Sequence, residues 1–364
     1  MPAEKSHILR DIGCVIGVRR DRLGARLCAM INSWRLGEAL GAPVRFGWPA
    51  DEGIGWARAK ALFDPGFLET KILDPDSLAA VESGLTHPFE SNVACAEANG
   101  RRYLLVDKPF GDLDFAALGI DAPQRSWSDS AAALNPFDAT LRRRAQVLAA
   151  QFGDPDTILH VRRGDLADPN APTFARFVAR YIPYSYYAAY VERHAPQGEL
   201  PVFSDCPHAA ERLRGAGIQA RQMTFDHSDL SACQRDLVEL LLLARPRVSV
   251  GGKSAFRETA AQLGGAANVR LFDAFDAATR RELMYLELAR DDLAPGEAIS
   301  CRVNLARQEF DAGEVRTALS IMEHAIKIDP AATGPRKVFA RLLDRAGDLT
   351  DAQRQRARAT GKAP

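Results

Sequence analysis

The chain has 364 residues, of which 46% are hydrophobic and 26% are charged, and its 47 lysines and arginines equal its 47 aspartates and glutamates. This balance excludes a general electrostatic attraction to nucleic acid or anionic lipid, so an anion site has to be a local cluster. No run approaches the roughly 18 apolar residues that span a bilayer, and the length allows two or three domains.

The first predicted domain, residues 1–150, opens with an apolar strand and a helix that Gly41 is placed to end. A second strand follows, so this segment predicts a β-α-β unit. Asp138 is placed to cap a later helix. The strands are predicted at 12–18, 44–48 and 103–106, and the helices at 23–40 and 139–152.

The second predicted domain, residues 151–295, alternates regularly between strands and helices. Such alternation predicts a parallel sheet covered by helices on both faces, with ligands beyond the carboxyl ends of its strands. The strands are predicted at 157–161, 201–204, 247–250 and 269–272, and the helices at 184–194, 207–215, 230–244 and 254–263.

The third predicted domain, residues 296–364, is helical and repeats with a period of 34 residues. Four pairs of identical residues carry the period, namely Ala306 and Ala340, Gly313 and Gly347, Ala318 and Ala352, and Pro330 and Pro364. This pattern resembles tetratricopeptide repeats, one fair copy and one degraded copy, which could bind a protein partner. Two copies are too few to be stable alone, so we expect them to pack on the preceding domain.

The first strand of the second domain runs into the segment His160-Val161-Arg162-Arg163-Gly164-Asp165. A planar guanidinium donates paired hydrogen bonds to phosphate oxygens, so this strand end predicts a diphosphate site. Asp165 can hold one arginine in place, and Gly164 allows a sharp turn. An arginine can also neutralise a departing diphosphate without a metal, a contact worth on the order of 3 kcal/mol. A surface salt-bridge cluster is the alternative.

Two further strand ends of this domain carry polar residues. Asp205 can accept two hydrogen bonds from the edge of a guanine, or it can simply cap the next helix. Ser254 begins a helix after a Gly-Gly-Lys turn, where free amides and a hydroxyl form a phosphate seat. The turn is not a P-loop, because that motif requires a glycine where Arg247 stands.

Several weaker features complete the sequence. Gly24 and Arg26 lie where the first strand meets its helix, so the glycine could let the backbone approach a ligand, or the segment could be an ordinary loop. Three D-x-D pairs, at 74–76, 112–114 and 154–156, are read as chance and not as metal sites. The six cysteines are scattered, and the N-terminus lacks a signal-peptide core, which predicts a cytoplasmic location, free or peripheral at the inner face of the membrane.

Taken in order, these segments resemble the GDP-fucose-dependent fucosyltransferase superfamily, which includes α1,2-, α1,6- and protein O-fucosyltransferases and the bacterial nodulation fucosyltransferase. The segment from His160 to Asp165 is similar to its H-x-R-R-x-D motif. The second and third motifs are matched by residues 203–205 and by 254–256, which end in Asp205 and Phe256. The glycine loop at 22–26 and the stretch 181–187 are also similar, so the resemblance covers about residues 12 to 275.

The resemblance implies an α/β fold of the GT-B type, a pair of Rossmann-like domains with the acceptor side in residues 1–150 and the nucleotide sugar in 151–295. It also implies inversion at the sugar carbon, with no cofactor and no metal. The implied catalytic residues are Arg162, on the β-phosphate, and Asp165, which orients it. The implied nucleotide-sugar-binding residues are His160 through its backbone, Arg163 without a distinct role, Asp205 on the guanine edge, Ser254 on the phosphates, and Gly24, Arg26 and Phe256.

The leading hypothesis is therefore an inverting transferase that moves fucose from GDP-fucose to a glycan, in the synthesis of a bacterial surface polysaccharide. No general base stands out in the sequence, and position 25 is alanine where many relatives have asparagine. Two alternatives stay open. One is a catalytically silent scaffold that binds a partner through its repeats, and the other is a transferase that uses another GDP-sugar.

Overall fold

The computed structural model describes residues 11–49, 59–88, 92–134, 136–151, 153, 155–226 and 228–347. These residues divide into two compact units. Unit 1 contains the described residues up to 156 together with 225–249 and 254–268, and unit 2 contains 157–224, 250–253 and 269–347. The three predicted domains stay a prediction, since these units divide the chain differently.

Unit 1 is built on a five-stranded sheet of order β2-β1-β5-β4-β3. Its strands are β1 (Ile12–Val18), β2 (Val44–Gly47), β3 (Leu85–Pro88), β4 (Val93–Ala98) and β5 (Arg101–Val106). Its helices are α2 (Leu23–Leu40), η2 (Ala59–Ala61), α3 (Pro65–Lys71), α4 (Pro75–Ser83), α5 (Phe115–Leu118), α6 (Trp127–Leu134), α7 (Ala139–Ala150), α12 (Ala232–Leu243) and α13 (Ala255–Gly264).

The predicted β-α-β unit is confirmed, because β1 pairs in parallel with β2 and also with β5. The sheet as a whole is mixed, however. Strands β3 and β4, which the sequence analysis did not predict, continue it as an antiparallel meander from β5. The implied Rossmann-like form of this domain is thus limited to its parallel half, and the antiparallel strands are a correction to it.

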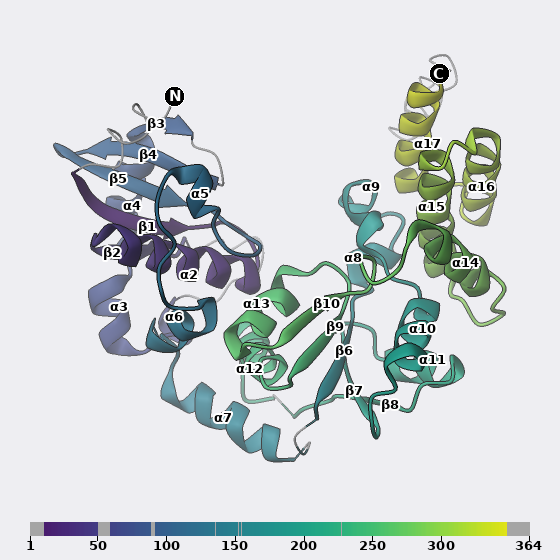
Figure 1. The fold of residues 1–364 in the computed structure, drawn as a ribbon, viewed down its shortest axis with the longest axis horizontal. Coiled ribbons are helices and arrows are strands. Elements are labelled where there is room, and N and C mark those ends of the chain that lie inside the picture. Colours follow the sequence, from purple (N-terminus) through teal and green to yellow (C-terminus); the bar gives the residue numbers. More distant parts are fainter. Residues whose placement is uncertain are drawn as a thin grey trace. The chain divides into compact units, whose positions relative to one another are not determined.

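The alternation of side chains along β1 places helices on both faces of this sheet (Figure 1). Ile16 lies in a buried cluster with Leu78 and Val81 of α4. On the other face, a β-carbon added to Gly17 would lie 3.1 Å from Cβ of Ser33, so α2 packs closely against the strand there.

Two helix ends follow from local chemistry, as the sequence predicted. Gly41 ends α2 in the left-handed conformation, with a φ of 62°. The carboxylate of Asp138 accepts the amides of Thr140 and Leu141 at the start of α7. The predicted end of that helix, residue 152, lies outside the described residues.

Unit 2 contains strands β6 (Thr157–Val161), β7 (Leu200–Ser204) and β8 (Ala220–Gln222), which pair in parallel. The second sheet has the order β10-β9-β6-β7-β8, and the boundary between the units passes through β9 (Val248–Gly251) and β10 (Ala267–Arg270). The helices of unit 2 are α8 (Gly164–Ala167), α9 (Phe174–Phe177), η4 (Val178–Arg180), α10 (Tyr184–His194), α11 (Ala209–Gly215), α14 (Ala277–Leu288), α15 (Pro295–Asp311), α16 (Val315–Ile328) and α17 (Thr333–Ala346).

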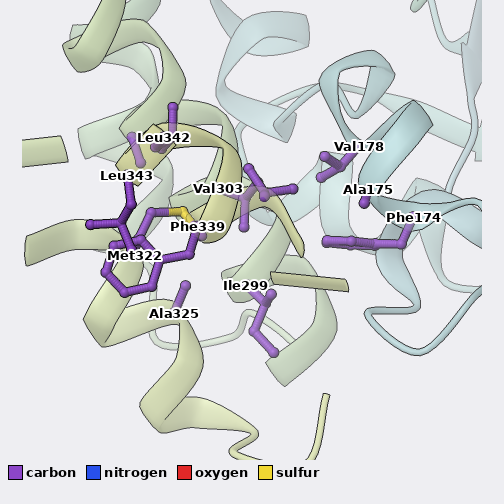
Figure 2. Close-up of a cluster of buried hydrophobic side chains, with 12 residues drawn as sticks. Phe174, Ala175, Val178, Ile299, Val303, Met322, Ala325, Phe339, Leu342 and Leu343 are labelled. Carbon is purple, nitrogen blue, oxygen red and sulfur yellow. The ribbon is translucent and has the colours of Figure 1, made fainter. Parts of the chain in front are cut away.

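The last three helices pack on the segment that follows β6, as the sequence predicted. Figure 2 shows the shared core, in which Phe174 and Val178 meet Ile299 and Val303 of α15 and Phe339 of α17. The tetratricopeptide assignment itself stays a prediction. The second helix of the second copy would fall in residues 348–364, which lie outside the described part of the chain.

An arginine clamp ties α11 to the residues after α14. Asp292 accepts from Arg290 at 2.9 Å and forms an ion pair with Arg212 at 2.8 Å. The hydrogen bonds from Arg290 and Arg212 hold the pKa of Asp292 well below its usual range.

All six cysteines are free thiols, and Cys206 alone among them is not buried. None of the helices in the described ranges is both long and apolar enough to cross a bilayer.

Candidate anion-binding site at the end of β6

The site begins where β6 ends, because that strand is buried along its whole length and delivers the next residues to the sheet edge. The parallel pairing sets Val161 opposite Ser204 at the end of β7. The Ser204 hydroxyl then donates to the Val161 carbonyl at 2.5 Å. The two strand ends are therefore locked together immediately before Arg162.

Arg162 is the guanidinium that this edge presents to solvent. Its Nη2 donates to Oδ1 of Asp165 at 2.7 Å, and the two side chains are 26% and 29% exposed. The other carboxylate oxygen accepts from the Thr173 hydroxyl at 3.2 Å, which fixes Asp165 in turn. Within the described residues, Nε and Nη1 of Arg162 have no protein acceptor, so they are available to a phosphate.

Arg163 points the other way, into the protein, where it is 3% exposed. Its Nε donates to Oε1 of Glu297 at 2.9 Å, and its Nη1 donates to the carbonyl of Ile182 at 3.0 Å. The guanidinium lies 4.5 Å from the ring centre of Tyr181 and 4.1 Å from that of Tyr184. The predicted role of Arg163 in binding the nucleotide sugar stays a prediction, and its side chain is already engaged in holding the loop.

Burial raises the pKa of both Tyr181 and Tyr184, although the nearby charge of Arg163 opposes the shift. Both side chains therefore stay neutral phenols at physiological pH and offer π-faces, not negative charge, to the guanidinium.

Asp205 also supports the loop. Its Oδ1 accepts the backbone amide of Arg163 at 2.6 Å. A β-carbon added to Gly164 would lie 2.6 Å from Oδ2 of Asp205, and Gly164 has a φ of 20°, so any other residue there would be strained. The alternative role as a helix cap is wrong, because α11 begins at Ala209 with His208 as its N-cap. A role in binding guanine stays a prediction. It would use the lone pairs of the Asp205 carboxylate that do not accept the Arg163 amide.

His160 lies on β6 and is 8% exposed. Its carbonyl oxygen accepts the hydroxyl of Tyr187 on α10 at 2.8 Å. The predicted contact between the His160 backbone and a base stays untested. What the structure adds is that α10 is hydrogen-bonded to the second-last residue of the strand that carries the site.

In unit 1, Gly24 and Phe256 lie against each other, because the first turns of α2 and α13 pack closely. A β-carbon on Gly24 would lie 2.6 Å from the Phe256 nitrogen and would overlap its Cα, and Thr259 donates to the Gly24 carbonyl at 2.9 Å. The glycine therefore serves helix packing, and the predicted approach of a ligand has no support here.

Arg26 and Ser254 are also engaged by their own unit. Arg26 is 2% exposed, and it donates to the carbonyls of Asp21 at 2.6 Å and Pro49 at 2.9 Å. The Ser254 hydroxyl caps α13 by accepting the amide of Arg257 at 3.5 Å. Both were predicted to bind the nucleotide sugar. For both residues this stays a prediction, and the guanidinium of Arg26 is buried against backbone carbonyls.

The D-x-D pairs have local structural roles. Asp74 caps α4 through the amide of Ser77. Asp112 forms a double hydrogen bond with Arg35, at 3.1 and 2.8 Å, and Asp114 caps α5. The third pair begins at residue 154, outside the described residues. In the ranges that the structure covers, no three His, Cys, Asp or Glu side chains gather in a way that could hold a metal ion.

Glu297, Thr173 and the role of Tyr184 in this site were not predicted from the sequence. Glu297 is 134 positions from Arg163. The general expectation that a buried arginine has a carboxylate partner was the only signal for it, and this expectation does not say which carboxylate. What the site brings together in unit 2 is one anchored, partly exposed arginine on a loop that is fixed from beneath. Such an arrangement can bind an anion and stabilise negative charge that develops on it.

No family model and no curated protein matches this sequence. Among solved structures, the chain is similar to the fucosyltransferase NodZ from Bradyrhizobium, at 13% identity and a TM-score of 0.43, over 68% of this chain and 92% of that one. It is similar to POFUT1 in complex with GDP-fucose, at 11% identity and a TM-score of 0.40, over 71% and 97%. It is also similar to a variant of FUT1 from Arabidopsis thaliana in complex with GDP, at 12% and 0.44, over 73% and 72%. At these values the likeness is distant, and it identifies neither a donor nor an acceptor for this chain.

Proposed function

We propose that the chain is a glycosyltransferase that takes a sugar from a nucleoside diphosphate sugar and uses Arg162 to bind the diphosphate. One observation carries the proposal. Arg162 follows a buried parallel strand, is held by Asp165 at 2.7 Å, and keeps two nitrogens without an acceptor among the residues that the structure describes. An arginine that served only a surface salt bridge would not need a carboxylate that is itself fixed by Thr173.

The chemistry follows from the charge that a departing diphosphate gains. When an acceptor hydroxyl attacks the sugar carbon and loses its proton to a base, the bond to the β-phosphate oxygen breaks and negative charge grows on that phosphate. A guanidinium that is already in place stabilises this charge without reorganisation at the moment of reaction. Asp165 contributes by keeping Arg162 in one orientation, which makes it a positioning residue.

The donor that fits best is GDP-fucose, because the segments 160–165, 203–205 and 254–256 resemble the three motifs of the GDP-fucose-dependent superfamily in the same order. The same resemblance favours inversion in a single displacement that needs no metal, and a glycan of a bacterial surface polysaccharide as acceptor. The general base is not assigned, and Asp205 and Ser254 are secondary candidates for donor contacts.

The test is release of fucose from GDP-fucose, measured with and without glycan acceptors. Arg162→Ala should lower turnover by about 100-fold or more, since a preorganised charge-stabilising group contributes roughly 3 to 4 kcal/mol. Arg162→Lys should recover only part of it, because an ammonium lacks the planar pair of donors.

Arg212→Ala is the matched control. Arg212 is an arginine of the same unit with a similar exposure of 29% and a carboxylate partner at 2.8 Å, but it belongs to α11 and its partner is Asp292, which is not in the loop after β6. It should leave turnover unchanged. Equal loss in both variants would contradict the proposal, and GDP binding without turnover of any GDP-sugar would favour the silent scaffold.

A further inference from the structure

We propose that the C-terminal helices are part of the donor site, and that Glu297 of α15 positions Arg162 by holding its neighbour Arg163. The inference rests on the proposed function for its effect on donor binding. Glu297 lies 134 positions after Arg163 along the chain, in a segment outside the motif.

The first link is a buried ion pair. Nε of Arg163 donates to Oε1 of Glu297 at 2.9 Å, and the two side chains are 4% and 8% exposed. The second oxygen of Glu297 accepts the amide of Ala294 at 3.4 Å, so the carboxylate is fixed to the start of its own helix. A pair so enclosed has one geometry, unlike an exposed pair that samples many.

The second link passes from Arg163 to the backbone of Arg162. Nη1 of Arg163 donates to the Arg162 carbonyl at 3.2 Å as well as to that of Ile182. The amide of Arg163 is held by Asp205 at 2.6 Å. Both the carbonyl and the amide of the peptide bond between Arg162 and Arg163 are therefore hydrogen-bonded. Glu297 contributes because it holds the guanidinium that donates to the carbonyl.

The third link is the close packing of α15 against the turn that carries Asp165. The Ser300 hydroxyl donates to the Leu166 carbonyl at 2.7 Å. Gly296 lies so close to the Ala167 carbonyl that a β-carbon there would overlap it. One turn of α15 thus touches the chain at three successive places after Arg162.

Two further hydrogen bonds join α15 and α17 to the segment that follows β6. Asn304 donates to the Val178 carbonyl at 2.8 Å, and Arg341 of α17 donates to the Ala175 carbonyl at 3.1 Å. The buried core in Figure 2 joins the same elements through Phe174 and Ile299. The contacts therefore run continuously from α17 to the loop of Arg162, and a repeat that only recruits a partner would not need them.

The experiment measures GDP affinity by calorimetry for Glu297→Gln, for Arg162→Ala and for the double variant. Arg162 donates charge-assisted hydrogen bonds, so misplacing it should weaken GDP binding about tenfold. We expect that loss in Glu297→Gln, and no further loss when it is added to Arg162→Ala, because Glu297 acts through Arg162. A general loss of stability would not produce this non-additivity.

Met322→Ala is the matched control, because Met322 is fully buried in the same core, whereas the hydrogen bonds from the last three helices to residues 163–167 come from α15. It should cost stability and leave GDP affinity within about twofold of the wild type, since a core cavity does not touch the anion site. If Glu297→Gln does not fold, Ser300→Ala replaces it, with an expected weakening of roughly fivefold for one hydrogen bond.

The outcomes separate the two proposals. If Arg162→Ala weakens GDP binding and Glu297→Gln does not, the inference is overturned and the proposed function stands. If GDP does not bind to the wild type, the proposed function fails, and hydrogen exchange of the amides at 163–167 decides the inference. Faster exchange in Glu297→Gln, but not in Met322→Ala, would support the bracing of the loop, and equal exchange in both would overturn it.

Discussion

Replacing Glu297 with glutamine removes the charge from a buried ion pair while it keeps the size of the side chain and one acceptor. At the 2.9 Å that separates Arg163 Nε from Glu297 Oε1, an effective dielectric constant of about 20 gives an attraction of about 6 kcal/mol. Because glutamine retains a hydrogen bond but leaves the guanidinium uncompensated, we expect a net loss near the lower end of the usual 3 to 5 kcal/mol, about 3 kcal/mol.

The assay is urea unfolding followed by circular dichroism, with Asp311→Asn as control. Arg345 and Asp311 also lie 2.9 Å apart, but their side chains are 54% and 63% exposed. That variant should lose less than about 1 kcal/mol, because solvent screens an exposed pair. If Glu297→Gln lost no more than the control, burial would not be the source of the stability, and the reasoning would be refuted.

Three further predictions follow from other parts of the molecule. Gly24→Ala should lose about 1 to 3 kcal/mol in urea unfolding, because its β-carbon would collide with the first turn of α13; an unchanged midpoint would show that the helices are not packed so closely. Asp292 has a pKa held below its usual range by two arginines, so the stability that it adds is present above about pH 4 and is lost as the pH falls further. The difference in urea midpoint between the wild type and Asp292→Asn should therefore become smaller on acidification. A difference that became larger would contradict the lowered pKa of Asp292. Burial raises the pKa of Cys28 to about 12, so iodoacetamide at pH 8 should modify Cys206, which is not buried, long before Cys28; peptide mapping that found Cys28 first would contradict this.

Much of the fold could be predicted because strong local signals agreed with the tertiary structure. Helix α2 spans the predicted residues 23–40, since Gly41 supplies the left-handed end that its last turn needs. Helix α10 begins and ends as predicted, after Pro183. The antiparallel strands β3 and β4 were missed, because short strands such as Leu85–Pro88 carry little periodicity of their own and depend on their neighbours in the sheet.

The site was only partly readable for a different reason. The sequence shows two adjacent arginines, and nothing local decides which faces solvent. Glu297 and the rings of Tyr181 and Tyr184 decide it by drawing Arg163 inward. Likewise, a glycine at position 24 is compatible with the close approach of either a ligand or a helix. Only the position of α13 shows that a helix packs there.

The most direct test of the central claim compares GDP with GMP by calorimetry in the wild type, Arg162→Ala and Arg212→Ala. If Arg162 binds the β-phosphate, the wild type should prefer GDP over GMP by about 10- to 100-fold, the value of charge-assisted hydrogen bonds. Arg162→Ala should lose that preference while its affinity for GMP stays the same, and Arg212→Ala should keep it. A preference for GDP that survives in Arg162→Ala would contradict the assignment of Arg162 to the diphosphate.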